Sequence, residues 1–204
     1  MRSKTEQELF WEGEFGNEYT TRNQILPEQR QPFFAQVLQK TYGVRTICEL
    51  GANRGHNLQA IANLSRNFEL TGVELNQVAI AELDKMPGVK AKQASIQEFE
   101  TDEKFDLVFT CGVLIHINPE DLPIIYEKIY NISSRYILLN EYYNPVPVEV
   151  HYRGHTSKLF KRDFASEFLE QYKGKVSVID NGFLWNKIHP GWDNTNWFLL
   201  ERIV

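Results

Sequence analysis

The sequence predicts an α/β fold: an open, mostly parallel sheet of seven strands with helices on both faces and a C-terminal antiparallel hairpin. Two observations lead to this prediction. Short apolar runs alternate with segments of helical period through most of the chain, which is typical of parallel βαβ units. The last two apolar runs are joined by a segment without helical period. Because a parallel crossover needs a connection the size of a helix, we expect these two runs to pair in antiparallel fashion.

Each strand is predicted from an apolar run that is too short for a helix. These runs are residues 46–50, 68–74, 89–94, 105–109, 136–139, 176–180 and 196–201. The helices are predicted from apolar residues that recur every three or four positions. They cover residues 28–42, 58–64, 76–86, 119–132 and 161–172. Gly43 and Pro87 can end the first and third of these helices, and Pro119 suits the first turn of the fourth.

The N-terminal segment is predicted to form a helix that also serves as a lid. Trp11, Phe15, Tyr19 and Arg22 recur every three or four residues, so their side chains would share one face. That face can pack on the core, and it can also exclude water from a site and place an aromatic ring against a cation.

Composition excludes several classes of protein. The 204 residues carry 22 Lys and Arg against 27 Asp and Glu, a net charge of −5, which argues against a broad basic face for nucleic acid. No run approaches the ~18 apolar residues of a membrane span. The two cysteines, Cys48 and Cys111, lie in apolar runs and are expected to be buried free thiols. No metal-ligand spacing is present, so we expect no metal and a single cytoplasmic domain over residues 1–204.

A glycine-containing loop follows the first predicted strand. Gly51 and Gly55 stand between that strand and a helix, where glycine allows close approach of a ligand to the backbone. Glu74 ends the next strand and can accept hydrogen bonds from ribose hydroxyls. Glu49, two residues before Gly51, would repel a pyrophosphate but suits the ammonium group of S-adenosylmethionine. Together these residues predict a bound nucleoside cofactor.

The loop sequence ELGANRG resembles the E/D-x-G-x-G-x-G motif of class I methyltransferases, with Asn53 in place of the middle glycine. Residues 105–122, FDLVFTCGVLIHINPEDL, are similar to the fourth strand and following loop of the same superfamily. The resemblance implies a Rossmann-like fold and S-adenosylmethionine as cofactor. The residues that it implies for cofactor binding are Glu49, Gly51, Asn53, Gly55, Glu74, Leu75, Ser95, Ile96, Cys111, Gly112 and Tyr19.

Two segments carry a narrower resemblance. FWEGEFGNEYTTRN (residues 10–23) and EYYNPVPVEVHYRGH (residues 141–155) resemble methyltransferases associated with pseudaminic acid biosynthesis. The resemblance implies methyl transfer to a small acidic sugar, a nonulosonic acid or its nucleotide-linked precursor. Methylation of another small metabolite, or a non-catalytic cofactor-binding scaffold in glycan synthesis, remain alternatives.

Candidates for a general base and for acceptor binding follow the predicted strands. The base candidates are His116, Glu141, His151 and His155, whereas His56 and His189 are expected to be packed or solvated. The acceptor-binding candidates are Tyr142, Tyr143, Arg153, Lys158 and Arg22. Arg153 and Lys158 belong to a basic cluster with Lys161 and Arg162, which either begins a solvated helix or recognises an anionic substrate.

The single domain divides by predicted role into four parts. They are a helical lid (1–42), a cofactor-binding sheet (43–141), a substrate-shaping insertion with a helix (142–175) and the C-terminal hairpin (176–204).

Overall fold

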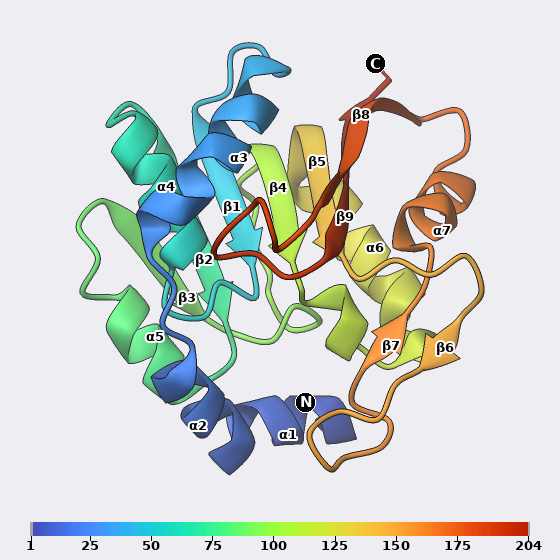
Figure 1. Cartoon of the computed structure of the whole chain (residues 1–204). Coiled ribbons are helices and arrows are strands. Elements are labelled where there is room, and N and C mark those ends of the chain that lie inside the picture. The colour runs from blue at the N-terminus through green and yellow to red at the C-terminus, as the bar shows by residue number, and fades with distance from the viewer. Residues whose placement is uncertain (1, 204) are drawn as a thin grey trace.

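The computed structural model describes residues 2–203, and its central element is a seven-stranded sheet in the order β3-β2-β1-β4-β5-β9-β8 (Figure 1). Its strands are β1 (Thr46–Leu50), β2 (Glu69–Glu74), β3 (Val89–Gln93), β4 (Phe105–Cys111), β5 (Ser133–Glu141), β8 (Val176–Leu184) and β9 (Thr195–Arg202). The first five are parallel, and β9 runs antiparallel to both β5 and β8. The predicted sheet and its C-terminal hairpin are confirmed.

Helices cover both faces of the sheet. One face carries α3 (Pro27–Gln39), α4 (His56–Leu64) and α5 (Gln77–Leu83), and the other carries α6 (Leu122–Ile132) and α7 (Phe164–Gln171) (Figure 1). Short 3₁₀ turns, η1 (Leu114–His116) and η2 (Pro119–Asp121), connect β4 to α6. The C-terminal ends of the parallel strands and the N-terminal ends of the helices that follow them lie, with η1, at the carboxyl edge of the sheet. Open α/β folds bind ligands at this edge.

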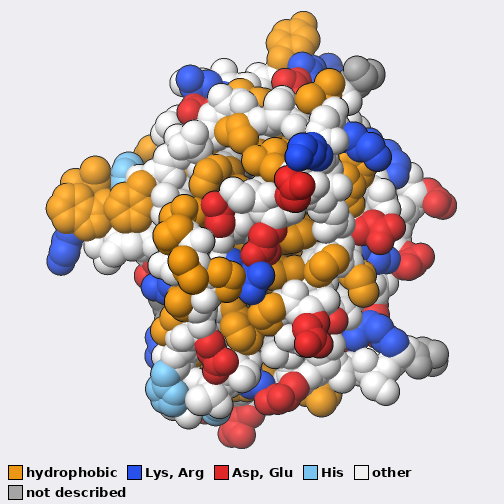
Figure 2. Space-filling view, turned by 90° about the vertical axis from the view of Figure 1, so that its right-hand side faces the viewer, with side chains coloured by type: hydrophobic (Ala, Val, Ile, Leu, Met, Phe, Trp, Pro, Cys, Tyr) orange, Lys and Arg blue, Asp and Glu red, His pale blue; other side chains and the backbone are white. Residues whose placement is uncertain are grey.

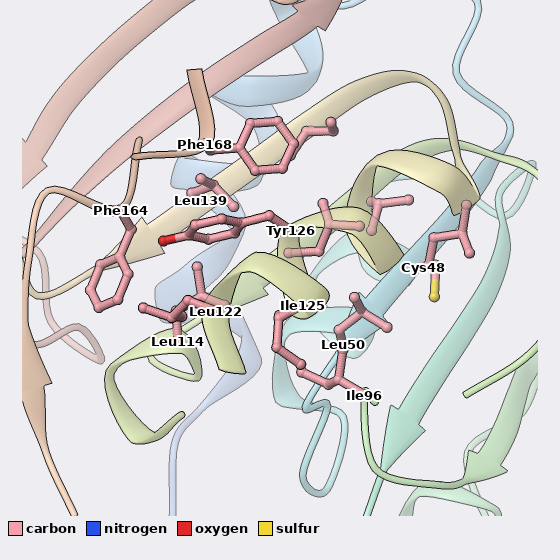
Figure 3. Close-up of a cluster of buried hydrophobic side chains, with 14 of the residues drawn as sticks. Cys48, Leu50, Ile96, Leu114, Leu122, Ile125, Tyr126, Leu139, Phe164 and Phe168 are labelled. Carbon is pink, nitrogen blue, oxygen red and sulfur yellow. The ribbon is translucent and has the colours of Figure 1, made fainter. Parts of the chain in front are cut away.

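Side chains of the inner strands alternate between two apolar cores. Ile47 and Leu107 pack under α3 and α4, whereas Cys48 and Val108 pack under α6 and α7. This alternation follows from the two-residue period of a strand that is buried on both faces. Figure 3 shows the second core, in which the ring of Tyr126 lies among leucine and phenylalanine side chains. Both cysteines are free as predicted, although Cys111 is only partly buried because it borders a cleft.

The N-terminal segment differs from the prediction of one helix. It forms two helices, α1 (Glu6–Glu12) and α2 (Glu14–Arg22), which meet at Gly13 and cross below the carboxyl edge of the sheet (Figure 1). Gly16 lies so close to the backbone of Trp11 that an added Cβ would be 1.8 Å from its carbonyl oxygen. The break at Gly13 thus lets α2 fold back against α1, which a continuous helix would not allow.

The insertion after β5 contains a ribbon that the sequence did not predict. Strands β6 (Val148–Glu149) and β7 (Phe160–Lys161) pair in antiparallel fashion, and the loop that joins them lies beside α1 (Figure 1). Gln7 of α1 donates a hydrogen bond of 3.2 Å to the carbonyl oxygen of Ser157 in this insertion. The insertion and the N-terminal helices therefore meet over the same edge of the sheet.

The outer face beside β8 and α7 carries acidic and basic side chains interspersed with apolar ones (Figure 2). Phe183, Trp185 and Ile188 of β8 and the following loop are among the exposed apolar residues of the described chain. No helix within residues 2–203 is long and apolar enough to cross a membrane.

Candidate functional site

A cleft lies at the carboxyl ends of β1, β2 and β4, and the helices α1 and α2 line its opposite wall. Most of the residues predicted to bind a cofactor line this one cavity. They are Glu49, Gly51, Asn53, Glu74, Leu75, Ser95, Ile96, Cys111, Gly112 and Tyr19. Gly55 does not line it. Its positive φ of 81° begins α4, and the side chains of Leu83 and Met86 pack against it, so its role is to shape the turn.

The loop after β1 approaches the cleft with two residues in the left-handed region. Gly51 has a φ of 77°, and an added Cβ would lie 2.5 Å from a methyl carbon of Val113, so no other residue fits there. Asn53 has a φ of 46°. Asparagine tolerates this conformation better than most residues, which explains how it replaces a glycine of the motif.

The carboxylate of Glu49 is fully enclosed at the base of the cleft. One oxygen accepts a hydrogen bond of 2.6 Å from Nδ2 of Asn57, and the other has no partner. Burial raises the pKa of Glu49 to about 8, although the bond from Asn57 and the positive charge of Arg30 lower it. A buried carboxylate with a free oxygen can bind a cation that enters the cleft.

Arg30 of α3 also lines the cleft, and the sequence analysis missed it. Its guanidinium donates to Oδ1 of Asn57 at 2.5 Å and to the carbonyl oxygen of Gly191 at 3.1 and 3.2 Å. It also lies 4.3 Å from the centre of the Trp192 ring. Asn57 thus bridges the guanidinium of Arg30 and the carboxylate of Glu49. The only local signal for Arg30 is a charged residue within a helix that has an apolar face. This pattern is too common to predict a binding site.

Glu74 ends β2 beside the loop. Its two carboxylate oxygens accept hydrogen bonds from the backbone N–H groups of Asn76 at 2.7 Å and Asn53 at 2.8 Å. Burial raises the pKa of Glu74, and these backbone hydrogen bonds oppose that rise. A carboxylate can accept about four hydrogen bonds, so Glu74 has the capacity to accept from a further donor.

The sheet and α1 together form the wall of the cleft that carries Ser95. Oγ of Ser95 accepts a hydrogen bond of 3.1 Å from Arg2, which also forms an ion pair with Glu8. Burial raises the pKa of Glu8, but hydrogen bonds from Arg2, Ser95 and the Thr5 backbone lower it to about 2. Glu8 is therefore ionised at neutral pH, and the N-terminal arm contributes to this wall.

His116 is the base candidate that the fold brings into the cleft. Its Nδ1 lies 2.6 Å from the carbonyl oxygen of Lys158, so Nδ1 carries the proton and Nε2 is left as an acceptor. The ring packs between Trp11, at 4.4 Å between centroids, and Tyr152, at 5.2 Å. Burial lowers the pKa of His116 to about 4, against the raising effect of the Lys158 carbonyl. The imidazole is thus neutral at pH 7.

Glu141 does not line the cleft. It is buried beneath the loop after β4, where its oxygens accept from the backbone N–H groups of Val113 at 3.2 Å and Ile115 at 3.5 Å. Burial raises its pKa to about 7, while these hydrogen bonds lower it. This carboxylate holds the segment that carries His116, so its place indicates a positioning role instead of contact with substrate.

Three of the other histidines are placed differently from expectation. His151 and His155 are exposed and do not line the cleft, and the His155 ring lies 4.9 Å from that of Phe10 on α1. His56, expected to be packed or solvated, lines the cleft at the start of α4, and burial lowers its pKa to about 4. Its position directly after the glycine loop was the available signal. His189 is partly buried in the loop before β9.

The acceptor-binding candidates are not among the residues that line the cleft. The Tyr142 hydroxyl donates to Asp193 at 2.6 Å, and Tyr143 is 38% exposed. Arg22 lies 5.0 Å from the centre of the Phe15 ring, and Arg153 lies 5.9 Å from that of Tyr152.

Two members of the predicted basic cluster are already paired. Lys158 is buried in an ion pair with Glu6, and Arg162 forms one of 2.7 Å with Glu167. The ammonium group of Lys158, predicted to bind the substrate, is occupied by Glu6 in this structure. The described residues contain no group of three or more His, Cys, Asp or Glu side chains that could hold a metal ion.

Comparisons with known proteins identify the type of fold. A family model described as a methyltransferase domain matches residues 48–134. No curated protein matches the sequence. The magnesium protoporphyrin IX methyltransferase ChlM from Synechocystis PCC 6803, solved with bound SAM, superimposes with a TM-score of 0.69 at 12% identity and covers 100% of both chains.

Two further solved structures are similar. The glycopeptide N-methyltransferase MtfA, in complex with S-adenosylmethionine, has a TM-score of 0.64 at 15% identity over 88% of this chain and 95% of its own. The N-terminal domain of EvdMO1, with SAH bound, has a TM-score of 0.61 at 17% identity over 87% and 81%. The similar structures share the predicted Rossmann-like methyltransferase fold, and the methyltransferase-domain model matches the part of the chain that carries the glycine loop. The narrower resemblance to methyltransferases of pseudaminic acid biosynthesis stays a prediction.

Proposed function

We propose that this chain uses S-adenosylmethionine to methylate a small acidic sugar, a nonulosonic acid of the pseudaminic type or its nucleotide-linked precursor. The observation that carries the cofactor assignment is the buried Glu49, whose second carboxylate oxygen has no partner in the cleft. An uncompensated carboxylate in such a place costs folding free energy, and a bound ammonium group would compensate it.

The methionine end of the cofactor needs one carboxylate and one cation. Glu49 would accept from the α-ammonium group, and Arg30 would donate to the α-carboxylate, since both line the same cavity. Asn57 holds the two side chains in a fixed relation. This pairing of charges fits a zwitterionic amino acid and does not fit a pyrophosphate.

The nucleoside end fits the remaining wall of the cleft. Glu74 would accept hydrogen bonds from the ribose hydroxyls with its remaining lone pairs. Leu75 and Ile96 offer apolar surface to the adenine ring, and Ser95 offers a hydroxyl at its edge. Gly51 lets the backbone approach the cofactor without a side chain in the way.

The bound cofactor supplies a methyl group that is already activated for displacement by its sulfonium. The chain therefore has to orient the acceptor, exclude water and remove one proton, and orientation alone can lower the barrier by ~7–11 kcal/mol. His116 is placed to accept the proton of an acceptor hydroxyl at Nε2, because its Nδ1 proton is held by Lys158. Trp11 and Tyr19 of the lid line the same cleft and exclude water from it.

Two cations of the insertion after β5 support an acidic acceptor. Arg153 and Lys161 lie on the aromatic rings of Tyr152 and Tyr142, and no ion pair engages either of them within the described residues. Guanidinium and ammonium groups of this kind suit a sugar carboxylate or phosphate. The proposed roles of the four segments follow: residues 1–42 as lid, 43–141 as cofactor site, 142–175 as acceptor site and 176–204 as hairpin.

The test combines binding with turnover. Calorimetry should show binding of S-adenosylmethionine and no binding of NAD. Mass spectrometry of a panel of nonulosonic acids and their nucleotide-linked forms should show the gain of one methyl group. His116→Gln should retain cofactor binding and lose turnover, whereas the matched control His151→Gln, on an exposed side chain, should retain both.

Each negative result would contradict a different part of the proposal. Methylation of a neutral metabolite but of no acidic sugar would contradict the acceptor class alone. Cofactor binding without turnover on any acceptor would favour a scaffold. No binding of S-adenosylmethionine would contradict the whole proposal.

A further inference from the structure

Lys158 contacts the base candidate through its backbone carbonyl and the lid through its side chain. Its carbonyl oxygen lies 2.6 Å from Nδ1 of His116. Its ammonium group forms an ion pair with Glu6 of α1 and lies 5.4 Å from the centre of the Phe10 ring. The Lys158 side chain is only 6% exposed, whereas that of Glu6 is 78% exposed. One residue of the insertion thus contacts both the lid and His116.

The docked lid is also what covers His116. Trp11 of α1 packs on the imidazole at 4.4 Å between ring centroids. On its other side α1 is held by Asn76, whose Nδ2 donates to the carbonyl oxygen of Trp11 at 3.0 Å. If α1 moved away from the insertion, one face of His116 would lose its aromatic cover and meet water.

We propose that Lys158 is a positioning residue that couples docking of α1 to the hydration of His116, so that the imidazole is dehydrated only when the lid is closed. This inference rests on the proposed role of His116 as base. The ion pair with Glu6 keeps the lid against the insertion, and the Lys158 carbonyl holds Nδ1 of His116, which leaves Nε2 as the acceptor.

The pKa of His116 depends on burial and not on neighbouring charged side chains. The titratable side chains on the elements packed around it include Glu6, Glu8 and Glu12 of α1, Tyr19 and Arg22 of α2, Glu120 and Asp121 of η2, Glu141 beneath its loop, and Tyr152, Arg153, His155 and Lys158 of the insertion. Burial is the largest influence on the pKa of His116, followed by the Lys158 carbonyl, and no charged side chain is a further cause. Removal of the lid should therefore act through hydration.

Titration of His116 by NMR tests the coupling without a methyl acceptor. In the wild-type protein the His116 resonance, assigned with His116→Gln, should titrate near pH 4. In Glu6→Gln and in Lys158→Met, which keeps the apolar stem and the backbone carbonyl, its midpoint should rise toward 6.5. The control is Glu12→Gln, because Glu12 lies on the same helix but pairs with Lys4 of the same arm at 2.5 Å.

S-adenosylhomocysteine then separates this inference from the proposed function. Saturation with it should return the midpoint in Glu6→Gln toward the wild-type value, since the ligand touches the lid. A midpoint that stays near 4 in both Glu6→Gln and Lys158→Met, or that rises equally in Glu12→Gln, would overturn the coupling. Failure of S-adenosylhomocysteine to bind any variant would contradict the cofactor assignment, while the shift between variants still decides the coupling.

Discussion

The pH dependence of cofactor binding follows from the burial of Glu49. In the cofactor-free protein its pKa is raised to about 8, so the carboxyl is mostly protonated at pH 7. A bound ammonium group requires the ionised form, so binding below pH 8 must release a proton from Glu49. The affinity for S-adenosylmethionine should therefore rise with pH, by at most about tenfold for each pH unit up to about 8.

The affinity should then pass through a maximum, because an α-amino group loses its own proton near pH 8. Glu49→Gln removes the titrating group and should abolish the rising limb. The variant also loses a charge-assisted hydrogen bond of about 1.5–3 kcal/mol. At pH 8 that loss corresponds to a Kd raised roughly 10- to 150-fold.

Isothermal titration calorimetry between pH 6 and 8, in buffers of different ionisation enthalpy, measures both the affinity and the protons released. The pH dependence of stability distinguishes loss of folding from loss of binding. The folded-state pKa of Glu49 is raised, so its ionisation destabilises the fold as pH rises from 4.5 through about 8. Glu49→Gln should thus be no less stable than the wild type at pH 8. Equal slopes of log Kd against pH for the two proteins would refute the reasoning.

Three further outcomes are expected. Glu74→Ala should raise the Kd for S-adenosylmethionine roughly 10- to 100-fold, because it removes the acceptors for the ribose and for the backbone N–H of Asn53; unchanged affinity by calorimetry would contradict the ribose assignment. Arg30→Met should weaken S-adenosylmethionine but not its decarboxylated analogue, and equal losses for the two ligands would show that Arg30 does not contact the carboxylate. Gly51→Ala should lower stability by about 1–3 kcal/mol in thermal unfolding, because its φ is 77° and the new methyl would meet Val113; a melting temperature equal to wild type would contradict this.

The strands and the cofactor side of the cleft were accessible from the sequence for a simple reason. Buried parallel strands are short apolar runs, and their carboxyl ends meet at one edge of the sheet. Glu49 and Glu74 stand at the ends of two such runs, so their positions along the chain already bring them together. The left-handed loop could likewise be anticipated from Gly51, since glycine at a strand–helix junction has few other uses.

The N-terminal helices show where periodicity is insufficient. The aromatic spacing from Trp11 to Tyr19 continues through Gly13, so the sequence indicates one helix. The break exists because α2 packs back on α1, with Gly16 against the Trp11 carbonyl. That contact is between helices, and no local pattern reports it.

The positions of the base and acceptor-binding candidates depend even more on contacts between segments far apart in the chain. His116 and Glu141 are both polar residues after strands, yet one enters the cleft and the other holds the loop beneath it. Lys158 belongs to a basic cluster in the sequence but pairs with Glu6, which lies 152 positions away. Local sequence carries no information about which partner such a side chain will meet.

The sequence by itself determined the α/β class, the seven strands and the acidic residues at their carboxyl ends, because hydrophobic periodicity and glycine placement act over a few neighbouring residues. Only the tertiary structure decided that Arg30 joins Glu49 through Asn57, and that Lys158 links the lid to His116. Those contacts join segments far apart in the chain, and their geometry is set by how the helices and the insertion pack around the sheet.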